Sequence, residues 1–291
     1  MQVKKLAYAL GAEITGVDLT RPLDDATIQA IRAAWLEHLV LLIRHQDITP
    51  EQHIAFSRRF GDLEVHPNKY NHHQDYPEIY VVTNKMVGDR PSDTRYVGRR
   101  WHSDGAYKLK PSMGSLLFSR ELPPVGGNTL FTNMYLAYEA LSPKLREVLD
   151  KLYALNDRGA AQNNGYVDPV RVAERLKLTP PVINPVVRVH PETGRKALYI
   201  NENVTTCFEN MTPEESRPLL EFLFAHSVRQ EFIYRHQWQV HDLLMWDNRC
   251  TMHLAPPDYD QTQPRYMMRT TIAGTPLGRL YIPGEPAPSS V

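Results

Sequence analysis

The motif with the clearest chemical meaning in this sequence is Trp101-His102-Ser103-Asp104. In an extended segment the side chains of residues i and i+2 point to the same side of the backbone. His102 and Asp104 can therefore present an imidazole nitrogen and a carboxylate oxygen together, as two neighbouring ligands of an octahedral metal ion. A His-x-Asp pair by itself is most often part of a surface loop, so a metal site also needs a second histidine.

His253 is the histidine whose surroundings favour that role. It follows an apolar run that starts at Leu243 and a polar turn, Asp247-Asn248-Arg249, the pattern of a buried strand with a tight turn. Two histidines and one carboxylate leave three positions open on one face of the metal, the arrangement used by non-haem iron(II) oxygenases. A zinc site would favour a further nitrogen or sulfur ligand, and neither Cys207 nor Cys250 is placed to supply one.

The last predicted strand carries two arginines. With a period of two residues, Arg265, Met267, Arg269 and Thr271 share one face, and the opposite face is suited to packing. A guanidinium held between two layers needs an anion, preferably a carboxylate bound through two hydrogen bonds. The pattern is open to two interpretations, a buried anion site and a solvated strand edge.

The composition is that of an ordinary globular protein. The 291 residues are 42% hydrophobic and 23% charged, and 33 Lys and Arg balance 33 Asp and Glu. A net charge of zero does not favour binding to nucleic acid or to an anionic membrane. No stretch reaches the roughly 18 apolar residues of a membrane span, and the N-terminus lacks a signal-peptide pattern. With only two cysteines and no CxxC pair, we expect a cytoplasmic protein.

The predicted elements are short helices between many short strands. The residues predicted to cap helices are Asp24 or Asp25, Thr49, Ser142 and Thr212, and the helix after Thr49 is expected to end at Gly61. The predicted strands are Ala12–Val17, Val40–Ile43, Ser115–Phe118, Thr129–Thr132, Val186–His190, Ala197–Ile200, Glu231–Trp238, Asp242–Trp246 and Tyr266–Ala273.

This pattern predicts an α+β chain built on a β-sandwich or jelly roll. Neither of the glycine-rich phosphate-binding motifs, GxGxxG after a strand or GxxxxGK[ST], occurs in the sequence, so nucleotide-binding α/β folds lose support. We predict a single domain over residues 1–282, followed by a flexible tail at residues 283–291.

Taken together, the ordered motifs resemble the taurine dioxygenase / 2,4-D dioxygenase family of iron(II)- and 2-oxoglutarate-dependent oxygenases. The resemblance covers nearly the whole chain, from about Gly11 to Leu277. The segments that carry it are Gly11–Leu19, Phe60–Leu63, Trp101–Asp104, Gly126–Thr129, Tyr138–Leu141, Trp246–Arg249 and Arg265–Arg269. It implies a double-stranded β-helix (jelly-roll) core with flanking helices.

The resemblance also implies roles for individual residues. His102, Asp104 and His253 match the family's three iron ligands. Thr129 matches the hydroxyl that assists the distal carboxylate of 2-oxoglutarate, and Arg265 matches the arginine that pairs with that carboxylate. The implied cofactors are Fe(II) and, as cosubstrate, 2-oxoglutarate. The reaction uses O2 and yields succinate, CO2 and an oxidised or cleaved product.

Two further matches concern the substrate. Arg269 matches the arginine that meets the sulfonate in taurine dioxygenase, and His66, in the pair His66-Pro67, matches a histidine that touches the same sulfonate. The herbicide-degrading members of the family lack this His-Pro pair. A sulfonate or a sulfate ester is therefore the expected substrate, with the same chemistry on a carboxylate such as an aryloxyalkanoate as the alternative.

Several differences from taurine dioxygenase disfavour taurine itself. After His66-Pro67 this chain has Asn68-Lys69-Tyr70, where taurine dioxygenase has a shorter segment with an aromatic residue. Val204 stands where that enzyme has a phenylalanine. Arg99 and Arg100 precede Trp101 where the taurine enzyme is polar and acidic, and residues 156–180 follow no member of the family. We expect a longer or more anionic substrate, and the roles of Lys69, Arg99 and Arg100 stay open.

The spacing of the two arginines favours two separate anions. Four residues along a strand correspond to about 13 Å at ~3.3 Å per residue, too far for both guanidinium groups to hold one small carboxylate. The simpler account places the cosubstrate on Arg265 and the substrate on Arg269, with His66 donating from a protonated or a neutral ring. The alternative is that Arg269 only pairs with a buried acid such as Asp247.

Two functions of other classes are also compatible with the metal motif. One is a non-catalytic jelly-roll module that binds a metal or a ligand, against which intact Thr129 and Arg265 count. The other is a zinc-dependent hydrolase with the same three ligands and a water. In each case the expected partners are small molecules and a second copy of the chain in a homo-oligomer, with no nucleic acid and no membrane.

Overall fold

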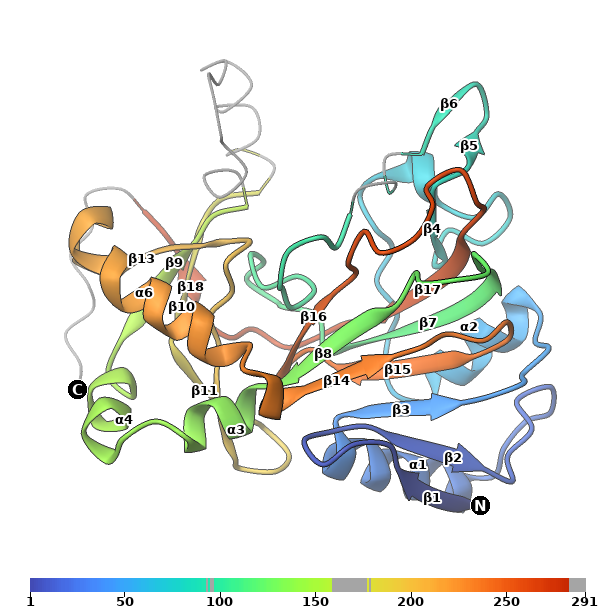
Figure 1. The fold of residues 1–291 in the computed structure, drawn as a ribbon, viewed down its shortest axis with the longest axis horizontal. Helices are drawn as coiled ribbons and strands as arrows, with labels where there is room; N and C mark the ends of the chain where they lie inside the picture. Colours follow the sequence, from blue (N-terminus) through green and yellow to red (C-terminus); the bar gives the residue numbers. More distant parts are fainter. Residues whose placement is uncertain (93, 95–96, 159–176, 178, 283–291) are drawn as a thin grey trace.

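Two β-sheets that pack against each other form the centre of the molecule (Figure 1). The computed structural model describes residues 1–92, 94, 97–158, 177 and 179–282. The larger sheet has the strand order β1 (Gln2–Lys5), β2 (Ala12–Thr15), β3 (Val40–Ile43), β15 (Leu243–Asp247), β7 (Gly114–Glu121), β17 (Tyr266–Ile272) and β4 (Tyr80–Thr83). The facing sheet has the order β14 (Ile233–His236), β8 (Thr129–Asn133) and β16 (Thr251–Leu254).

Smaller sheets and hairpins lie outside this pair. They are β13 (Thr205–Phe208), β9 (Tyr153–Asn156), β10 (Val182–Pro185) and β18 (Arg279–Leu280) in one sheet, β11 (Val187–Val189) with β12 (Lys196–Leu198), and β5 (Met86–Val87) with β6 (Arg90–Pro91). The helices are α1 (Asp25–His38), α2 (Pro50–Arg58), α3 (Met134–Glu139), α4 (Pro143–Leu149) and α6 (Pro213–Ser227), with 3-10 turns η1 (Lys69–Asn71) and η3 (Gln230–Phe232). This is the predicted α+β class.

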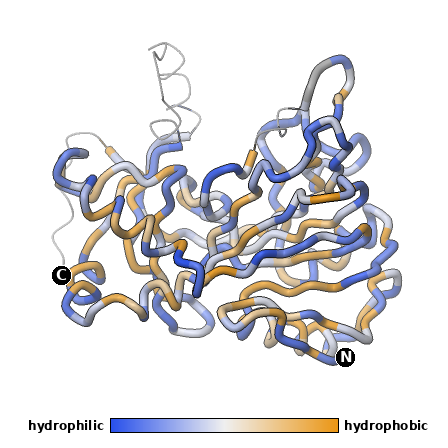
Figure 2. The backbone as a smooth tube through the Cα atoms, in the orientation of Figure 1, coloured by the Kyte–Doolittle hydropathy of each residue, from blue (hydrophilic) through white to orange (hydrophobic). Residues whose placement is uncertain are grey.

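Both faces of the larger sheet pack against apolar clusters, one of them beneath helices α1 and α2. In β7, Leu116 and Phe118 belong to the apolar cluster beneath α1 and α2, whereas Leu117 points to the cluster shared with the smaller sheet. In β17, Met267 and Met268 are divided between the same two clusters. Successive side chains point to opposite faces of a strand, so a sheet covered on both faces is apolar at successive positions. Figure 2 shows hydrophobic residues along these strands and hydrophilic residues in the loops above them.

The predicted helix starts are confirmed. Asp24 accepts from the Thr27 N–H, and both Thr49 and Thr212 form complete capping boxes with the third helical residue. Ser142 caps α4. One predicted end was wrong, because α2 ends at Arg58 and not at Gly61.

The predicted strands agree with the structure apart from their ends, which shift by up to three residues. The largest correction concerns Glu231–Trp238, where the chain first forms the 3-10 turn η3 and then a strand that ends at His236. Trp238 therefore lies beyond the strand. The tail at 283–291 and most of the stretch at 156–180 lie outside the described residues, so the domain boundary stays a prediction. No helix in the part of the chain described is long and apolar enough to cross a membrane.

Candidate active site

The two predicted histidine ligands lie directly opposite each other. The backbone N–H of His102 donates to the His253 carbonyl at 3.1 Å, and the reverse bond is 2.8 Å. These two bonds form an antiparallel bridge between His102 and β16. The two imidazole ring centres lie 4.1 Å apart. The Ser103 hydroxyl donates to the Thr251 carbonyl at 2.7 Å and holds the same segment against β16. The long-range pairing therefore supplies the second histidine that the His-x-Asp motif needs.

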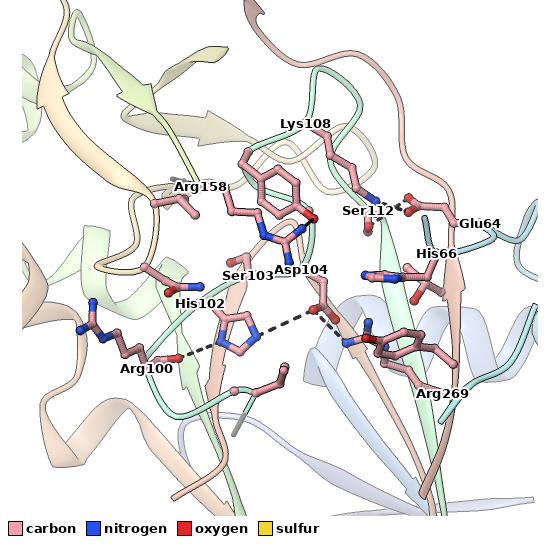
Figure 3. A pocket seen from close by; sticks show the side chains of 18 of the residues that line it. Glu64, His66, Arg100, His102, Ser103, Asp104, Lys108, Ser112, Arg158 and Arg269 are labelled. Atoms are coloured by element: carbon pink, nitrogen blue, oxygen red, sulfur yellow. Dashed lines mark hydrogen bonds and ion pairs between the residues drawn. The ribbon is translucent and has the colours of Figure 1, made fainter. Parts of the chain in front are cut away.

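His102, Asp104 and His253 form one group of metal donors, and Figure 3 shows His102 and Asp104 of this group. The Asp104 Oδ1 atom is 3.8 Å from the His102 Nε2 atom and 4.0 Å from the His253 Nε2 atom. The His102 Nδ1–H donates to the Arg100 carbonyl at 2.8 Å, so its Nε2 atom keeps a lone pair toward the other two residues. A backbone hydrogen bond that selects the tautomer is usual for a metal-ligating histidine. The donor set of two nitrogens and one oxygen fits the facial arrangement used for iron(II).

Asp104 is buried and kept ionised by its neighbours. It accepts from the Ser115 hydroxyl at 2.6 Å and from the Arg269 guanidinium at 3.1 Å. Burial acts to raise the pKa of Asp104, but the charges of Arg269 and of the two histidines outweigh it, so this pKa lies well below its usual range. Asn248 accepts from the Asp104 backbone N–H at 3.2 Å and donates to the Ser115 hydroxyl at 3.1 Å. The carboxylate is therefore held in position and in the form that binds a cation.

His253 is buried against aromatic rings. Its ring centre lies 4.8 Å from that of Trp246 and 6.0 Å from that of Phe131. Burial, with a smaller contribution from the charge of His102, lowers the pKa of His253 to about 3. At neutral pH the ring is neutral, which is the form that binds metal.

A cavity of about 400 Å³ opens in front of this group (Figure 3). Its charged lining residues are Glu64, Glu78, Arg99, Arg100, Asp104, Lys108, Arg158 and Arg269. The position of Arg99 and Arg100, which the sequence left open, is therefore the cavity wall. Val204 also lines the cavity, whereas Lys69 is not among the described residues that do.

His66 points into the same cavity as a neutral hydrogen-bond donor (Figure 3). Its ring stacks on Tyr80 with centres 4.1 Å apart, and its Nδ1 atom accepts from the Asn68 N–H at 3.1 Å. Burial, and then the charges of Arg269, Arg158 and Lys108, lower the pKa of His66 to about 4. Of the two forms expected from the sequence, the structure therefore favours the neutral ring with the proton on Nε2.

Arg269 lines the cavity and pairs with Asp104. The sequence-based alternative, that Arg269 pairs with a buried acid such as Asp247, is right about a buried acid but wrong about which one, because Asp247 is already occupied. Arg249 donates to both Asp247 carboxylate oxygens at 2.8 and 2.6 Å, and His190 lies 3.0 Å from one of them. The Nε atom of Arg269 is buried without a hydrogen-bond partner. Asp104 therefore does not use all the N–H groups of Arg269.

Arg265 lines a second, smaller cavity of about 50 Å³, and Val97 and Arg99 line both cavities. Arg265 is only 7% exposed, and its side chain donates from Nε to the Gly127 carbonyl at 3.3 Å. Burial lowers its pKa, as expected for a charge removed from water. Among the described residues no carboxylate pairs with it. Such a guanidinium fits an anionic ligand.

The turn before β8 brings its backbone close to Arg265. Gly126 and Gly127 both have positive φ angles, of 79° and 68°, and a Cβ atom on Gly126 would lie 2.1 Å from the Asp258 carbonyl oxygen. Asp258 itself accepts from the Gly127 N–H and pairs with Arg235, so its carboxylate is engaged elsewhere. The Gly-Gly pair is thus required by a close approach of two chain segments.

Thr129 starts β8 directly after this turn. Its hydroxyl oxygen accepts from the Trp238 indole N–H at 3.0 Å, so its hydrogen can still be donated. Asn128 lines the smaller cavity, whereas Thr129 is not among the lining residues. The structure therefore places Thr129 beside the predicted 2-oxoglutarate site.

Sequence reasoning missed the residues that position Asp104. Ser115 and Asn248 carried no assigned role, although Asn248 belongs to the quoted segment Trp246-Asp247-Asn248-Arg249. Tyr107 and Arg158 of the cavity wall were also missed. The polar turn after a buried strand was the available signal for Asn248, because such a turn must satisfy its own backbone groups.

The family described as "Taurine catabolism dioxygenase TauD, TfdA family" matches residues 2–271 of this chain. The chain belongs to the TauD/TfdA family. It is 34% identical over 279 residues to the (S)-phenoxypropionate/alpha-ketoglutarate-dioxygenase of Sphingobium herbicidovorans, covering 94% of this chain and 95% of that protein. It is 33% identical over 286 residues to the alpha-ketoglutarate-dependent sulfate ester dioxygenase of Pseudomonas putida, covering 96% and 91%.

Solved structures of the TauD/TfdA family have the same fold. The crystal structure of AAD-2 in complex with Mn(II) and N-oxalylglycine superimposes with a TM-score of 0.83 at 34% identity, covering 95% of this chain and 99% of that one. The predicted jelly-roll core is thereby confirmed. The protein is a dioxygenase that depends on Fe(II) and on 2-oxoglutarate, which is the alpha-ketoglutarate of its relatives' names. Neither the non-catalytic module nor the zinc hydrolase is retained.

Proposed function

We propose that this TauD/TfdA dioxygenase oxidises a small organic sulfonate or sulfate ester. In this proposal His102, Asp104 and His253 hold the iron, Arg265 and Thr129 bind the distal carboxylate of 2-oxoglutarate, and the substrate occupies the larger cavity. One observation carries it: Arg269 and the neutral His66, with its proton on Nε2, both line the cavity that His102 and Asp104 also line. A sulfonate or a sulfate ester has several oxygen acceptors for such donors.

Bound iron, 2-oxoglutarate and O2 would supply the oxidation of a substrate C–H bond. For a sulfonate, insertion of one oxygen atom at the carbon next to sulfur gives a 1-hydroxysulfonate, which breaks its C–S bond to an aldehyde and hydrogensulfite. The second oxygen atom goes into succinate, which forms from 2-oxoglutarate with loss of CO2. Each turnover thus consumes one O2 and one 2-oxoglutarate.

The protein residues contribute position and charge. The Ser115 hydroxyl and the Asn248 amide hold Asp104, and the Arg100 carbonyl fixes the orientation of His102. Arg269 and His66 would hold the anionic end of the substrate beside the metal donors, which keeps one carbon close to the site of oxidation. Because His66 stays neutral near neutral pH, it orients the substrate without moving a proton.

The separation of the two arginines supports two anion sites. Arg265 and Arg269 line different cavities that adjoin at Val97 and Arg99. The cosubstrate on Arg265 and the substrate on Arg269 then do not compete for one guanidinium.

An aryloxyalkanoate is the second candidate substrate, because relatives such as that of Sphingobium herbicidovorans carry phenoxypropionate in their names. Arg269 would bind a carboxylate as well as a sulfonate. The lining of the larger cavity argues for the smaller and more polar anion. Eight of its twenty lining residues are charged, its aliphatic members are Val97 and Val204, and its aromatic members besides histidine are Tyr80 and Tyr107.

The test is a substrate panel combined with one variant. Sulfonates, sulfate esters, aryloxyalkanoates and phosphonates are compared by the succinate that they produce above the substrate-free background. In Arg269→Ala we expect a strong loss of substrate-dependent turnover and only a mild loss of substrate-free 2-oxoglutarate decarboxylation.

Because Arg269 also touches Asp104, an anaerobic Fe(II) titration of the variant is the necessary control. Unchanged metal affinity with selective loss of coupled turnover supports the proposal. An equal loss of coupled and uncoupled turnover contradicts the role of Arg269. Turnover of aryloxyalkanoates alone contradicts the substrate class.

Localisation, domain extent and assembly remain expectations from the sequence. We propose a cytoplasmic enzyme made of a single domain over residues 1–282 and assembled as a homo-oligomer. Size-exclusion chromatography with light scattering tests the assembly.

A further inference from the structure

Arg158 brings a positive charge into the substrate cavity from a different part of the chain. It lies two residues after the end of β9, and its side chain points into the larger cavity (Figure 3). The proposed function assigns it no role. The other cationic side chain with an assigned role in this cavity, Arg269, comes from β17.

Arg158 is held in place by Tyr107. Its Nη1 atom donates to the Tyr107 hydroxyl at 2.9 Å, and its guanidinium carbon lies 4.9 Å from the centre of the Tyr107 ring. Tyr107 in turn packs against the small buried cluster of Ala106, Tyr199 and Val204. A guanidinium stacked on a supported aromatic ring has lost much of its rotational freedom before any ligand arrives.

Arg158 has no acidic partner among the described residues, which distinguishes it from Lys108 and Arg269 in the same cavity. Lys108 pairs with Glu64, and Arg269 pairs with Asp104. The remaining lining carboxylate, that of Glu78, pairs with Arg58. The charge of Arg158 is also among the causes that lower the pKa of His66, after burial and Arg269, so it acts within the same space.

We propose that Arg158 is a specificity-determining residue that binds a second anionic group of the substrate. The substrate would then be a sulfonate or sulfate ester that carries a carboxylate at its other end. This inference rests on the proposed function, in which Arg269 and His66 hold the first anionic group. The cavity of about 400 Å³ has room for a short chain between the two groups.

The experiment compares substrates that differ only in the second charge. Butane-1-sulfonate, 4-sulfobutanoate and the methyl ester of 4-sulfobutanoate are assayed with the iron-loaded full-length enzyme and 2-oxoglutarate. In the wild type we expect kcat/KM for 4-sulfobutanoate to exceed the other two values by about ten- to a hundredfold, the range of one charge-assisted hydrogen bond.

Three variants then test the residue. Arg158→Gln should remove the preference by raising KM for 4-sulfobutanoate, with little change for butane-1-sulfonate or for substrate-free decarboxylation. Tyr107→Phe keeps the ring but loses the hydroxyl that Arg158 contacts, and should lower the preference partly. Arg217→Gln, at an exposed position of α6, is the matched control and should change nothing.

The outcomes separate this inference from the proposed function. Sulfonate turnover without a preference for the doubly charged substrate, or an equal change for all three substrates in Arg158→Gln, overturns the role of Arg158 alone. No turnover of any sulfonate or sulfate ester overturns the proposed function and this inference with it.

Discussion

Two groups that each contain a histidine, an aspartate and a third possible metal ligand lie in the described part of this chain. They differ in what their atoms already bind. His102, Asp104 and His253 form the first, and His190, Asp247 and Cys250 form the second. In each group the possible metal-binding atoms lie within 4.8 Å of one another. By residue type and distance alone, the two groups look equally suited to a metal.

The second group has used its donors internally. His190 Nδ1 accepts from the backbone N–H groups of Glu192 and Thr193 at 3.2 and 3.1 Å, and its Nε2–H is directed to Asp247. Asp247 is bound by Arg249 through two hydrogen bonds. Burial raises the pKa of the Cys250 thiol well above its usual value, which disfavours the thiolate that metals bind.

The first group keeps its lone pairs and faces a cavity. The His102 Nε2 atom is left available by the bond of its Nδ1 atom to a carbonyl, and Asp104 lines the larger cavity. The comparison teaches that available lone pairs and access, rather than donor type, separate a metal site from a structural ion-pair network.

The largest effect is expected from the three proposed ligands. His102→Ala, Asp104→Ala and His253→Ala should each abolish coupled turnover and metal binding, because each removes one of three protein ligands. His190→Ala should keep metal binding and instead lower stability by about 1–3 kcal/mol, the cost of leaving buried polar groups unsatisfied. Anaerobic Fe(II) titration and urea unfolding measure the two effects. Near-normal turnover in any of the three ligand variants would show that the assignment is wrong.

The second largest effect is expected for two buried arginines, Arg265 and Arg249, which differ in whether a carboxylate already pairs with them. Arg265 has no carboxylate partner among the described residues, whereas Arg249 is occupied by Asp247 and Glu192. Arg265→Ala should raise the half-saturation concentration of 2-oxoglutarate by about thirty- to several thousandfold, the range for losing one partner of a desolvated charge pair.

Arg249→Gln is the control for this change. It should lower the free energy of unfolding by about 3–5 kcal/mol because it breaks a buried ion pair. It should leave 2-oxoglutarate affinity nearly unchanged. An unchanged half-saturation concentration in Arg265→Ala would move the cosubstrate anchor to another residue, with Arg269 as the next candidate.

A smaller effect is expected at Asn248, which follows Asp247 in the chain and contacts Asp104. Its side chain accepts from the Asp104 N–H, while its neighbour Asp247 belongs to the occupied group. Asn248→Ala should weaken metal affinity by about 10- to 100-fold, as for other residues that orient a metal ligand. Cys250→Ala is the control, and its metal affinity should match the wild type. If the two variants behave alike, Asn248 does not position Asp104.

The smallest effect concerns pH. The pKa of His66 is lowered from 6.5 to about 4, so this ring gains a proton only as pH falls through about 4. The ratio of the substrate KM values of His66→Gln and the wild type should therefore stay constant from about pH 5.5 to 8. Steady-state kinetics over this range measure it. A change of that ratio near pH 6.5 would mean that His66 titrates as an exposed histidine.

Local signals in the sequence predicted the starts of helices well. The residues Thr49 and Thr212 each cap a helix through contacts within three positions, so their sequence neighbours suffice. The short helix α3 was missed because six residues hold less than two turns, too few to show a helical period. Strands β9, β10 and β13 were also missed, because each has four residues and none is the continuous apolar run that revealed Val40–Ile43.

In the candidate site, too, some residues could be found from the sequence and others could not. His102 and Asp104 could be found from a two-residue spacing, and His253 from the turn that precedes it, although the evidence for each alone was weak. The acid partner of Arg269 was predicted wrongly, because Asp247 and Asp104 are both buried acids and only packing brings one of them to Arg269.

The sequence by itself determined the α+β pattern, the helix caps and the donor types of the metal group. These depend on contacts within a few residues or on the fixed geometry of a strand. Only the tertiary structure decided that His190 is occupied, that His66 is neutral and that Arg158 faces the substrate cavity. The reason is that burial, unused lone pairs and unbalanced charges depend on segments far apart in the sequence, whose packing sets what each group can still bind.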